Sequence, residues 1–275
     1  MPYITTSAAP STSLFYEDLG SGPPIVLIHG WPLSHRMWEG QVNALLAACY
    51  RCIAYDRRGF GDSGRPDAGY DYDTFASDLN DLLTSLELNE VTLAGFSMGG
   101  GEVARYIGRY GTSRVSKAML IGAVTPFLLQ TSDNPEGVEG RVFDDMVAAV
   151  TADRIGFLES FMQDFFNWKP GSGTPSDDVV AFSKSLAWPA SPIGTRQCIV
   201  AFGQTDFRGD LASIDVPTLV IHGDKDRIVP LEVSGARAAA MIAGATLVVI
   251  KGAPHGLNAT HGAALNAAML DFLKA

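Results

Sequence analysis

Cysteine is scarce in this chain of 275 residues, which contains Cys49, Cys52 and Cys198 and no others. An odd number of thiols cannot all pair. The Cys49-Tyr-Arg-Cys52 segment straddles an expected helix end and strand start, whereas a redox pair opens a helix. We therefore expect all three thiols to be structural or inert.

Long apolar runs and a basic charge balance are missing as well. No run reaches the ~18 residues needed to span a bilayer, and residues 1–10 have neither the basic start nor the apolar core of a signal peptide. The net charge of −10 and the pI near 4.9 repel phosphate backbones and anionic lipid. We therefore expect a cytoplasmic protein with small neutral partners, and neither a nucleic acid nor a membrane among them.

What is present is an ordinary globular composition, with 47% hydrophobic and 18% charged residues, and a length that suits one large domain with an insertion. Apolar runs suited to buried strands lie at 25–29, 51–55, 91–96, 117–123, 217–222 and 246–251. Segments with helical spacing alternate with them, at 36–48, 74–86, 98–110, 231–242 and 259–273. This alternation predicts an α/β fold, a mainly parallel and doubly wound sheet with helices on both faces. Residues 13–19 alternate polar and apolar side chains, which predicts an antiparallel hairpin at the sheet edge.

The alternation stops between about residues 125 and 207, where no convincing strand appears. We expect residues 126–206 to form a helical cap, or lid, inserted into a core domain made of residues 1–125 and 207–275. Most aromatic side chains of the insertion are expected to form its own core, and a minority to line a pocket. These aromatic residues are Phe157, Phe161, Phe165, Phe166, Trp168, Phe182 and Trp188.

One segment carries the strongest chemical signal. The strand-like run 91–96 leads into Gly95-Phe-Ser-Met-Gly99, and a helix-compatible stretch follows. This context is typical of a nucleophile elbow, a tight turn from strand to helix that exposes a serine hydroxyl. Glycine is needed at positions 95 and 99 because a Cβ there would crowd the neighbouring strand and helix. We therefore predict that Ser97 is a catalytic nucleophile.

A serine nucleophile needs a base that takes its proton and an acid that orients the base. The loops that follow residues 217–222 and 246–251 lie at the carboxyl ends of late strands, where sites in open parallel sheets collect. They carry Asp226 and His255, which completes the chain order Ser, Asp, His that this architecture uses. We predict Asp226 as the acid and His255 as the base.

Other residues compete for these roles, and we interpret them as structural. Asp224 is expected to stabilise its turn, and His261 to lie in the first turn of the last helix. His29 and His222 each end a strand directly before a glycine, where histidine more often has a structural role. Ser63 lies in a Gly-Asp-Ser-Gly segment like that of trypsin-like proteases, but those are double β-barrels and this chain alternates α and β.

Acyl transfer also needs two donors for the oxyanion that develops on the carbonyl. We expect one to be the backbone N–H of Met98, which follows Ser97 at a helix N-terminus. The other is expected from the loop 29–34, with the N–H of Trp31 as our choice. Pro32 restricts Trp31 and so helps to set where its groups point, with a simple turn proline as an equal alternative.

With these residues in place, the chain resembles the α/β-hydrolase superfamily over nearly its whole length. More closely, it is similar to the cofactor-free bacterial haloperoxidases, also called perhydrolases, and to the related arylesterases. The resemblance rests on His29-Gly-Trp-Pro-Leu-Ser34, Asp56-Arg-Arg-Gly-Phe-Gly-Asp-Ser63, Gly95-Phe-Ser-Met-Gly-Gly-Gly-Glu102, His222-Gly-Asp-Lys-Asp-Arg227 and Gly252-Ala-Pro-His-Gly256. It implies a triad of Ser97, Asp226 and His255, with an oxyanion hole at Trp31 and Met98.

The resemblance also implies a chemistry. An acyl-enzyme on Ser97 is resolved by water, which gives ester hydrolysis, or by hydrogen peroxide, which gives a peracid that oxidises halide away from the protein. It implies no haem, flavin or metal. Some relatives are γ-lactamases, so the expected partners are a small ester, lactam or carboxylic acid together with hydrogen peroxide. A homo-oligomer is an expectation from family analogy alone.

Other classes of function are disfavoured. Metal-assisted hydrolysis by His29, His222, His255 and nearby aspartates would lack the His-x-His or His-Glu-x-x-His spacings of such sites. A non-catalytic receptor on the same fold need not keep all three triad members. Haloalkane dehalogenases and epoxide hydrolases would carry aspartate where Ser97 stands.

Overall fold

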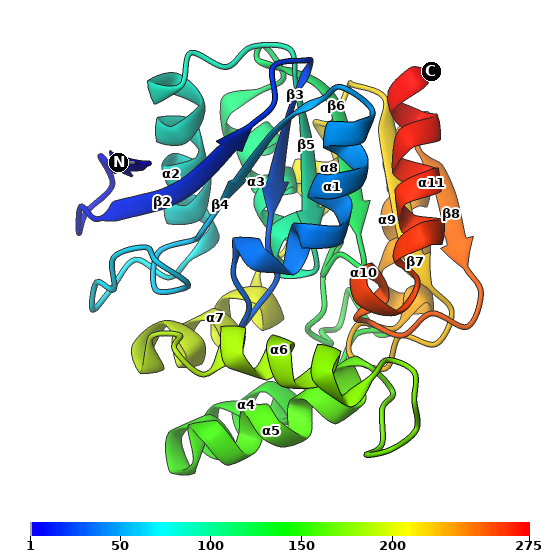
Figure 1. Ribbon diagram of the computed structural model, residues 1–275. Helices are drawn as coiled ribbons and strands as arrows, with labels where there is room; N and C mark the ends of the chain where they lie inside the picture. Colours follow the sequence, from blue (N-terminus) through cyan, green and yellow to red (C-terminus); the bar gives the residue numbers. More distant parts are fainter. Residues whose placement is uncertain (1) are drawn as a thin grey trace.

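In the computed structural model, which describes residues 2–275, an eight-stranded sheet forms the centre of the described chain (Figure 1). The strands are β1 (Tyr3–Thr5), β2 (Ser13–Leu19), β3 (Pro24–Ile28), β4 (Arg51–Tyr55), β5 (Val91–Phe96), β6 (Val115–Ile121), β7 (Thr218–Gly223) and β8 (Thr246–Ile250). Their order across the sheet is β1-β2-β4-β3-β5-β6-β7-β8. Neighbours from β4 to β8 pair in parallel, and β1 and β2 add antiparallel pairs at one edge. The predicted mainly parallel α/β fold is confirmed.

Helices cover both faces of this sheet. On one face lie α1 (Glu39–Ala47) and α11 (Gly262–Lys274), which pack against each other. The other face carries α2 (Tyr72–Ser85), α3 (Met98–Tyr110), α8 (Arg208–Ala212) and α9 (Gly235–Met241). The short segments η1 (His35–Trp38), η2 (Leu231–Val233) and α10 (Leu257–Thr260) complete the core helices. The sheet is therefore doubly wound, as predicted.

Local sequence explains why these segments form. Strands β5 and β7 are buried at every position, as expected for parallel strands covered on both faces, and most of their residues are apolar. Helix α2 begins where the Asp71 side chain accepts a hydrogen bond from the Thr74 N–H. Phe75, Leu79 and Leu82 then recur at helical spacing and are fully buried. The core is built from such apolar faces.

Some predicted boundaries need correction. Each of the helices predicted at 36–48, 231–242 and 259–273 is divided into a short helical segment and a longer helix. The pattern also missed β1, which is only Tyr3–Thr5 and pairs with β2, so that β1 and not β2 occupies the edge. Three residues are too few for a period of two to be visible in a sequence.

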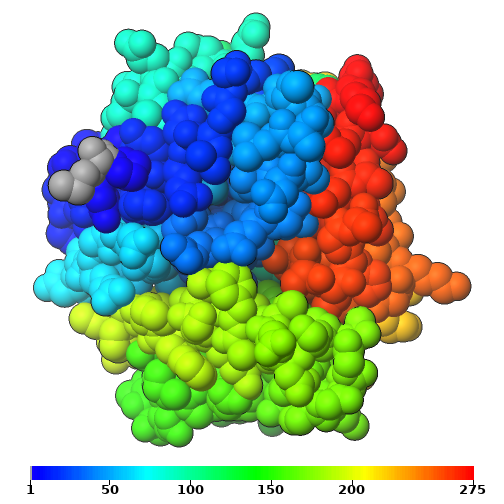
Figure 2. Space-filling view, viewed as in Figure 1, coloured from blue at the N-terminus to red at the C-terminus, as the bar shows by residue number. Residues whose placement is uncertain are grey.

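Residues between β6 and β7 form a separate group of helices below the sheet in Figure 1. They are α4 (Gly140–Ala152), α5 (Arg154–Phe165), α6 (Asp177–Ala187) and α7 (Pro192–Gln204). Helix α4 packs against α5 and α7, and α5 packs against α6. In the space-filling view they form the lower part of the molecule (Figure 2). Within residues 2–275, no helix is long and apolar enough to cross a membrane.

Candidate active site

The turn between β5 and α3 carries Ser97. Its backbone has φ 53° and ψ −118°, a left-handed conformation that a serine rarely adopts outside a strained functional turn. A Cβ at Gly95 would lie 2.2 Å from the Gly99 carbonyl oxygen, and one at Gly99 would lie 2.4 Å from the Ile28 carbonyl oxygen. Both distances are too short, which agrees with the predicted need for glycine at these two positions. The tight turn thereby leaves the Ser97 hydroxyl free of its own backbone.

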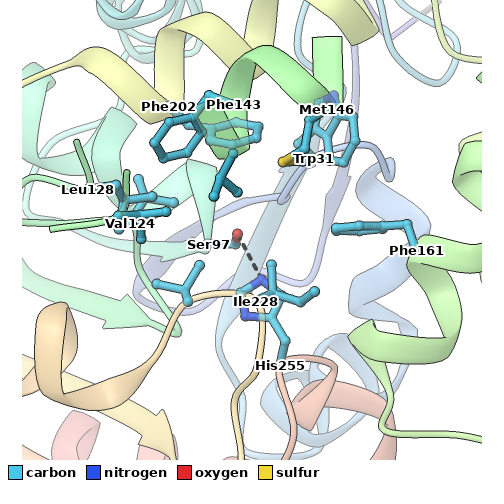
Figure 3. Close-up of a pocket in the computed structure, with 13 residues that line it drawn as sticks. Trp31, Ser97, Val124, Leu128, Phe143, Met146, Phe161, Phe202, Ile228 and His255 are labelled. Atoms are coloured by element: carbon cyan, nitrogen blue, oxygen red, sulfur yellow. Dashed lines mark hydrogen bonds between the residues drawn. The ribbon is translucent and has the colours of Figure 1, made fainter. Parts of the chain in front are cut away.

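The three residues predicted as a triad lie in hydrogen-bonding distance of one another. The Ser97 hydroxyl lies 2.9 Å from His255 Nε2 (Figure 3), and His255 Nδ1 lies 2.6 Å from Asp226 Oδ2. With Nδ1–H donating to the carboxylate, Nε2 is the acceptor for the Ser97 proton. All three side chains are buried, with Ser97 6% exposed. This arrangement allows proton transfer from the hydroxyl to the imidazole.

The carboxylate of Asp226 is held by its own loop. Its Oδ1 accepts hydrogen bonds from the backbone N–H groups of Ile228, at 2.9 Å, and Val229, at 2.8 Å. Burial by itself would raise the pKa of Asp226, but the His255 ring and hydrogen bonds from His222 and His255 outweigh it and hold the pKa well below its usual range. Asp226 is therefore ionised at neutral pH and oriented by several donors.

The competing acidic residue, Asp224, lies on the same loop but points elsewhere. Its Oδ1 accepts a hydrogen bond of 2.6 Å from the Gly252 N–H. Asp224 thus links the loop after β7 to the loop after β8, which carries His255. Asp224 is structural, but through a link to a second loop and not within its own turn as predicted.

The other histidines are held by local contacts. The buried His29 accepts a hydrogen bond from the Arg57 N–H and donates one to the Gly30 carbonyl, and burial with the nearby Arg57 guanidinium lowers its pKa to about 3. His261 caps α11 and is half-buried. His222 donates to the Val229 carbonyl at 2.8 Å and also lies close to the Asp226 carboxylate. That second contact was not foreseen from the sequence.

The loop after β3 runs directly past the nucleophile. A Cβ placed on Gly30 would lie 3.1 Å from the Cβ of Ser97, which shows how close this loop comes to the nucleophile. Trp31 is the next residue of the loop and lines the same cavity as Ser97. Within residues 2–275, the backbone N–H groups of Trp31 and Met98 have no hydrogen-bond acceptor. Neither N–H is used within the described fold, which the predicted oxyanion role requires, and that role stays a prediction.

A small apolar cavity opens in front of Ser97 (Figure 3). Its volume is about 70 Å³. Ser97 and His255 contribute polar groups to it, and no charged side chain lines it among the described residues. Its apolar wall includes Val124, Leu128, Phe143, Met146, Phe161, Phe202 and Ile228.

The aromatic residues of the insertion divide only in part as the sequence indicated, and the lining residues were mostly missed. Phe165, Phe166 and Trp168 are buried, but Phe182 and Trp188 are exposed. Of the aromatics singled out, Phe161 lines the cavity, whereas Phe143 and Phe202 were not foreseen as lining residues. Phe165 packs edge-on against the His255 ring, with 5.1 Å between the ring centroids. Phe166 lies in the core behind it. Helical spacing alone could not tell which aromatic residues of α5 face the cavity and which face the core, because almost every turn of α5 carries one.

A buried polar cluster next to the site also went unnoticed. The Arg57 guanidinium pairs with the Glu102 carboxylate at 2.7 Å, donates to the His29 carbonyl at 2.9 Å, and is 1% exposed. The Tyr55 hydroxyl donates to the same carboxylate. This cluster ties β4 and α3 to the end of β3, where the loop with Trp31 begins. The consecutive charges of the Asp-Arg-Arg segment indicated only an ordered loop.

His35, which the sequence left without an interpretation, has a defined place. Its Nδ1 lies 2.9 Å from Asp56 Oδ1, and the same oxygen accepts the His35 backbone N–H at 2.7 Å. Burial disfavours the charged ring, but the Asp56 carboxylate outweighs burial and raises the pKa of His35. Ser63 is structural, as expected, since its hydroxyl donates to the Asp56 carbonyl and accepts the Phe15 N–H.

Cys49, Cys52 and Cys198 are all free, and Cys49 is exposed. Burial raises the pKa of Cys52 to about 11 and that of Cys198 to about 12, which disfavours their reactive thiolate forms. Among residues 2–275, no group of three or more His, Cys, Asp or Glu side chains is arranged to hold a metal ion.

Fold and site together define the class of protein. The chain belongs to the alpha/beta hydrolase fold family, and the sequence pattern of that family matches residues 23–261. A putative non-heme chloroperoxidase of Synechocystis sp. is 50% identical and aligns over 100% of both chains. A bifunctional esterase/perhydrolase of Acinetobacter calcoaceticus is 35% identical, again over 100% of both chains. The crystal structure of a bromoperoxidase from Bacillus anthracis superposes with a TM-score of 0.94, at 49% identity, over 99% of this chain and 100% of that one. The protein is thus an α/β-hydrolase enzyme of the haloperoxidase and esterase/perhydrolase branch.

Proposed function

We propose that the protein is a serine hydrolase of small acyl substrates, with esterase and perhydrolase activity, that works through an acyl-enzyme on Ser97. The observation that carries the proposal is the continuous hydrogen-bonded line from the Ser97 hydroxyl through His255 to Asp226. A nucleophile, a base and an ionised acid in this order are the elements of acyl-transfer catalysis. The names of the relatives support the same two activities.

In the first half of the proposed reaction, Ser97 Oγ attacks the acyl carbon of the ester and His255 Nε2 takes the hydroxyl proton. The carbonyl oxygen becomes an oxyanion that accepts the N–H groups of Trp31 and Met98. Asp226 stabilises the imidazolium that forms. The bond to the leaving alcohol then breaks, His255 returns the proton to the alcohol oxygen, and the acyl group remains on Ser97.

In the second half, a water molecule gives a proton to His255 and its oxygen attacks the acyl-enzyme. The bond to Ser97 breaks, the proton returns to Oγ, and a carboxylic acid leaves. Hydrogen peroxide reacts in the same way and gives a peroxycarboxylic acid. One peroxyacid, one halide ion and one proton then give the carboxylic acid and a hypohalous acid in solution, so halide needs no site on the protein.

The cavity supports small, uncharged acyl groups as substrates. Its wall is apolar, so an acyl chain with a carboxylate would lose hydration there without a partner. We also propose that residues 126–206 act as a cap that sets acyl specificity, because Phe143, Met146, Phe161 and Phe202 of this segment form one wall of the cavity.

The decisive experiment compares the wild type with Ser97→Ala and Ser213→Ala on aryl acetates of increasing acyl length, on γ-lactams, and on acetate plus hydrogen peroxide with a halide acceptor. Ser213 is a matched control, since it is an exposed serine at the end of α8. We expect Ser97→Ala to lower ester hydrolysis and perhydrolysis together by roughly 10⁴-fold or more, and Ser213→Ala to change neither.

An organophosphate should label the wild type and Ser213→Ala on Ser97 and leave Ser97→Ala unlabelled. Activity that survives Ser97→Ala would refute the proposal, and loss with a chelator would then favour metal-assisted hydrolysis. A wild type that shows neither a burst nor steady turnover on any of these substrates would favour a receptor. Faster turnover of lactams than of esters would make a γ-lactamase the main activity.

A further inference from the structure

The Asp226 carboxylate faces a second imidazole in addition to that of His255. His222 is the penultimate residue of β7, and its Nε2 lies 3.2 Å from Asp226 Oδ2. The same oxygen accepts His255 Nδ1 at 2.6 Å. His222 is fully buried, so this contact is shielded from water. Asp226 Oδ2 is thus shared between the two rings.

The contacts of His222 fix where its proton lies. Nε2 is 2.8 Å from the Val229 carbonyl oxygen, and a carbonyl can only accept, so Nε2 carries the hydrogen. On the other side of the ring, Nδ1 has no hydrogen-bond partner within residues 2–275. It lies against Gly235, where a Cβ would be 2.4 Å away. A proton on Nδ1 would therefore be buried without an acceptor, which is costly. His222 is thus a neutral N–H donor whose one hydrogen is divided between the Val229 carbonyl, at 2.8 Å, and the more distant Asp226 Oδ2, at 3.2 Å.

Among the described residues, the ionic partners of the Asp226 carboxylate are His222 and His255. Its own loop also donates the backbone N–H groups of Ile228 and Val229, which bind Oδ1. Helix α9 contributes Gly235 beside His222, and α5 contributes Phe165 against the His255 ring. Besides His255, His222 is therefore the side chain whose replacement changes the surroundings of Oδ2.

We propose that His222 is a positioning residue that orients the Asp226 carboxylate and limits the negative charge that Oδ2 presents to His255. The proposal rests on the proposed function, because it concerns the same triad. An N–H that shares Oδ2 withdraws charge from that oxygen. Without this donor, Oδ2 would stabilise the protonated form of His255 more strongly. A larger share of the enzyme would then lack a free base at mildly acidic pH.

The test compares His222→Leu, which removes the donor, with His222→Gln, whose amide can restore it. For His222→Leu we expect the acidic limb of the kcat/KM profile for an aryl acetate to move to higher pH by about 0.5 to 1 unit. A shift of this size corresponds to only part of the free energy of a charge-assisted hydrogen bond. In His222→Gln the acidic limb should lie close to its wild-type position, because the amide restores the donor. A lower kcat/KM with an unchanged profile in both variants would overturn the proposal.

Ser234→Ala is the matched control for damage to the same loop. The buried Ser234 hydroxyl donates to the Pro230 carbonyl and does not touch Asp226, so its loss should lower stability and leave the pH profile in place. If Ser234→Ala shifts the limb as much as His222→Leu does, the effect is general loosening and the proposal fails.

The wild type provides a reading that does not depend on a variant folding. Nitrogen-15 NMR of the histidine rings should show His222 neutral with its proton on Nε2 throughout the pH range of the kcat/KM profile. A proton on Nδ1, or a charged His222 ring, would overturn the proposal. Failure of the proposed function is a separate outcome, seen as wild-type activity that does not require Ser97.

Discussion

At the residue scale, the loop beside the site depends on an imidazole, that of His29, which its neighbours hold in the neutral state. Its Nε2 accepts the Arg57 N–H and its Nδ1–H donates to the Gly30 carbonyl. A second proton would place an N–H on Nε2 against the N–H of Arg57. The neutral ring therefore fixes the start of the loop that carries Trp31, and its protonation must weaken the folded state.

This predicts a stability that falls with pH below neutrality. The pKa of His29 is lowered to about 3 in the folded protein from 6.5, so between these values the unfolded chain binds a proton that the folded chain does not. The contribution of the neutral His29 ring to the unfolding free energy is complete above pH 6.5 and is lost as the pH falls toward 3. Relative to His29→Gln, the wild type should lose about 1.4 kcal/mol of unfolding free energy per pH unit in that window.

Urea unfolding of both proteins at pH 7, 6, 5 and 4 would measure this difference. Carboxylates titrate in both proteins and cancel in the comparison. If the two unfolding free energies remain parallel over this range, His29 is not the residue responsible.

At the element scale, the close approach of α3 to β3 is what allows the nucleophile elbow. Gly99 on α3 meets the backbone of β3, because a Cβ there would lie 2.4 Å from the Ile28 carbonyl oxygen. Backbone atoms of a central strand cannot move aside as a flexible side chain can. In contrast, Gly40 on α1 has nothing within 4 Å of the position where its Cβ would be.

The same substitution should therefore have opposite effects on two helices. We expect Gly99→Ala to lower the unfolding free energy by about 1–3 kcal/mol through overpacking, and to lower kcat because the shift displaces Ser97. Gly40→Ala should raise the unfolding free energy by up to about 1 kcal/mol through helix propensity, with activity unchanged. Chemical denaturation and ester hydrolysis measure both effects. A Gly99→Ala variant with wild-type stability and kcat would show that α3 and β3 are not in this close contact.

At the scale of the whole molecule, residues 126–206 are joined to the rest by packing and by backbone hydrogen bonds. Trp31 packs against Phe161 and Phe202, and its Nε1 donates to the Thr195 carbonyl at 3.0 Å. The Gly256 N–H donates to the Phe165 carbonyl at 2.8 Å, directly beside His255. One buried apolar cluster includes residues from both parts. Separating the two parts would expose this shared core to water.

We therefore expect a single cooperative unfolding transition. Tryptophan fluorescence, far-UV circular dichroism and ester hydrolysis should be lost at the same urea concentration, because the cavity and the shared core depend on the same contacts. Trp31 reports on the boundary itself, while Trp168 and Trp188 report on residues 126–206. A circular dichroism signal that falls in two steps, the first together with activity and fluorescence, would show that the helices of this segment unfold on their own.

The sequence by itself determined the sheet and located the main site residues. The runs at 51–55 and 91–96 agree with β4 and β5 residue for residue, because a strand buried on both faces must be apolar along its length. The order of Ser97, Asp226 and His255 along the chain was readable because each follows a strand at its carboxyl end. Their catalytic roles remain our proposal.

Only the tertiary structure decided which distant side chains meet. Nothing near His222 in the sequence indicates that its ring shares Asp226 with His255, or that Arg57 pairs with Glu102 across 45 positions. The same holds for Phe143 and Phe202, whose place in the cavity depends on how α4 and α7 pack. Periodicity records which face of an element is buried, whereas the partners on that face are set by the packing of the whole chain.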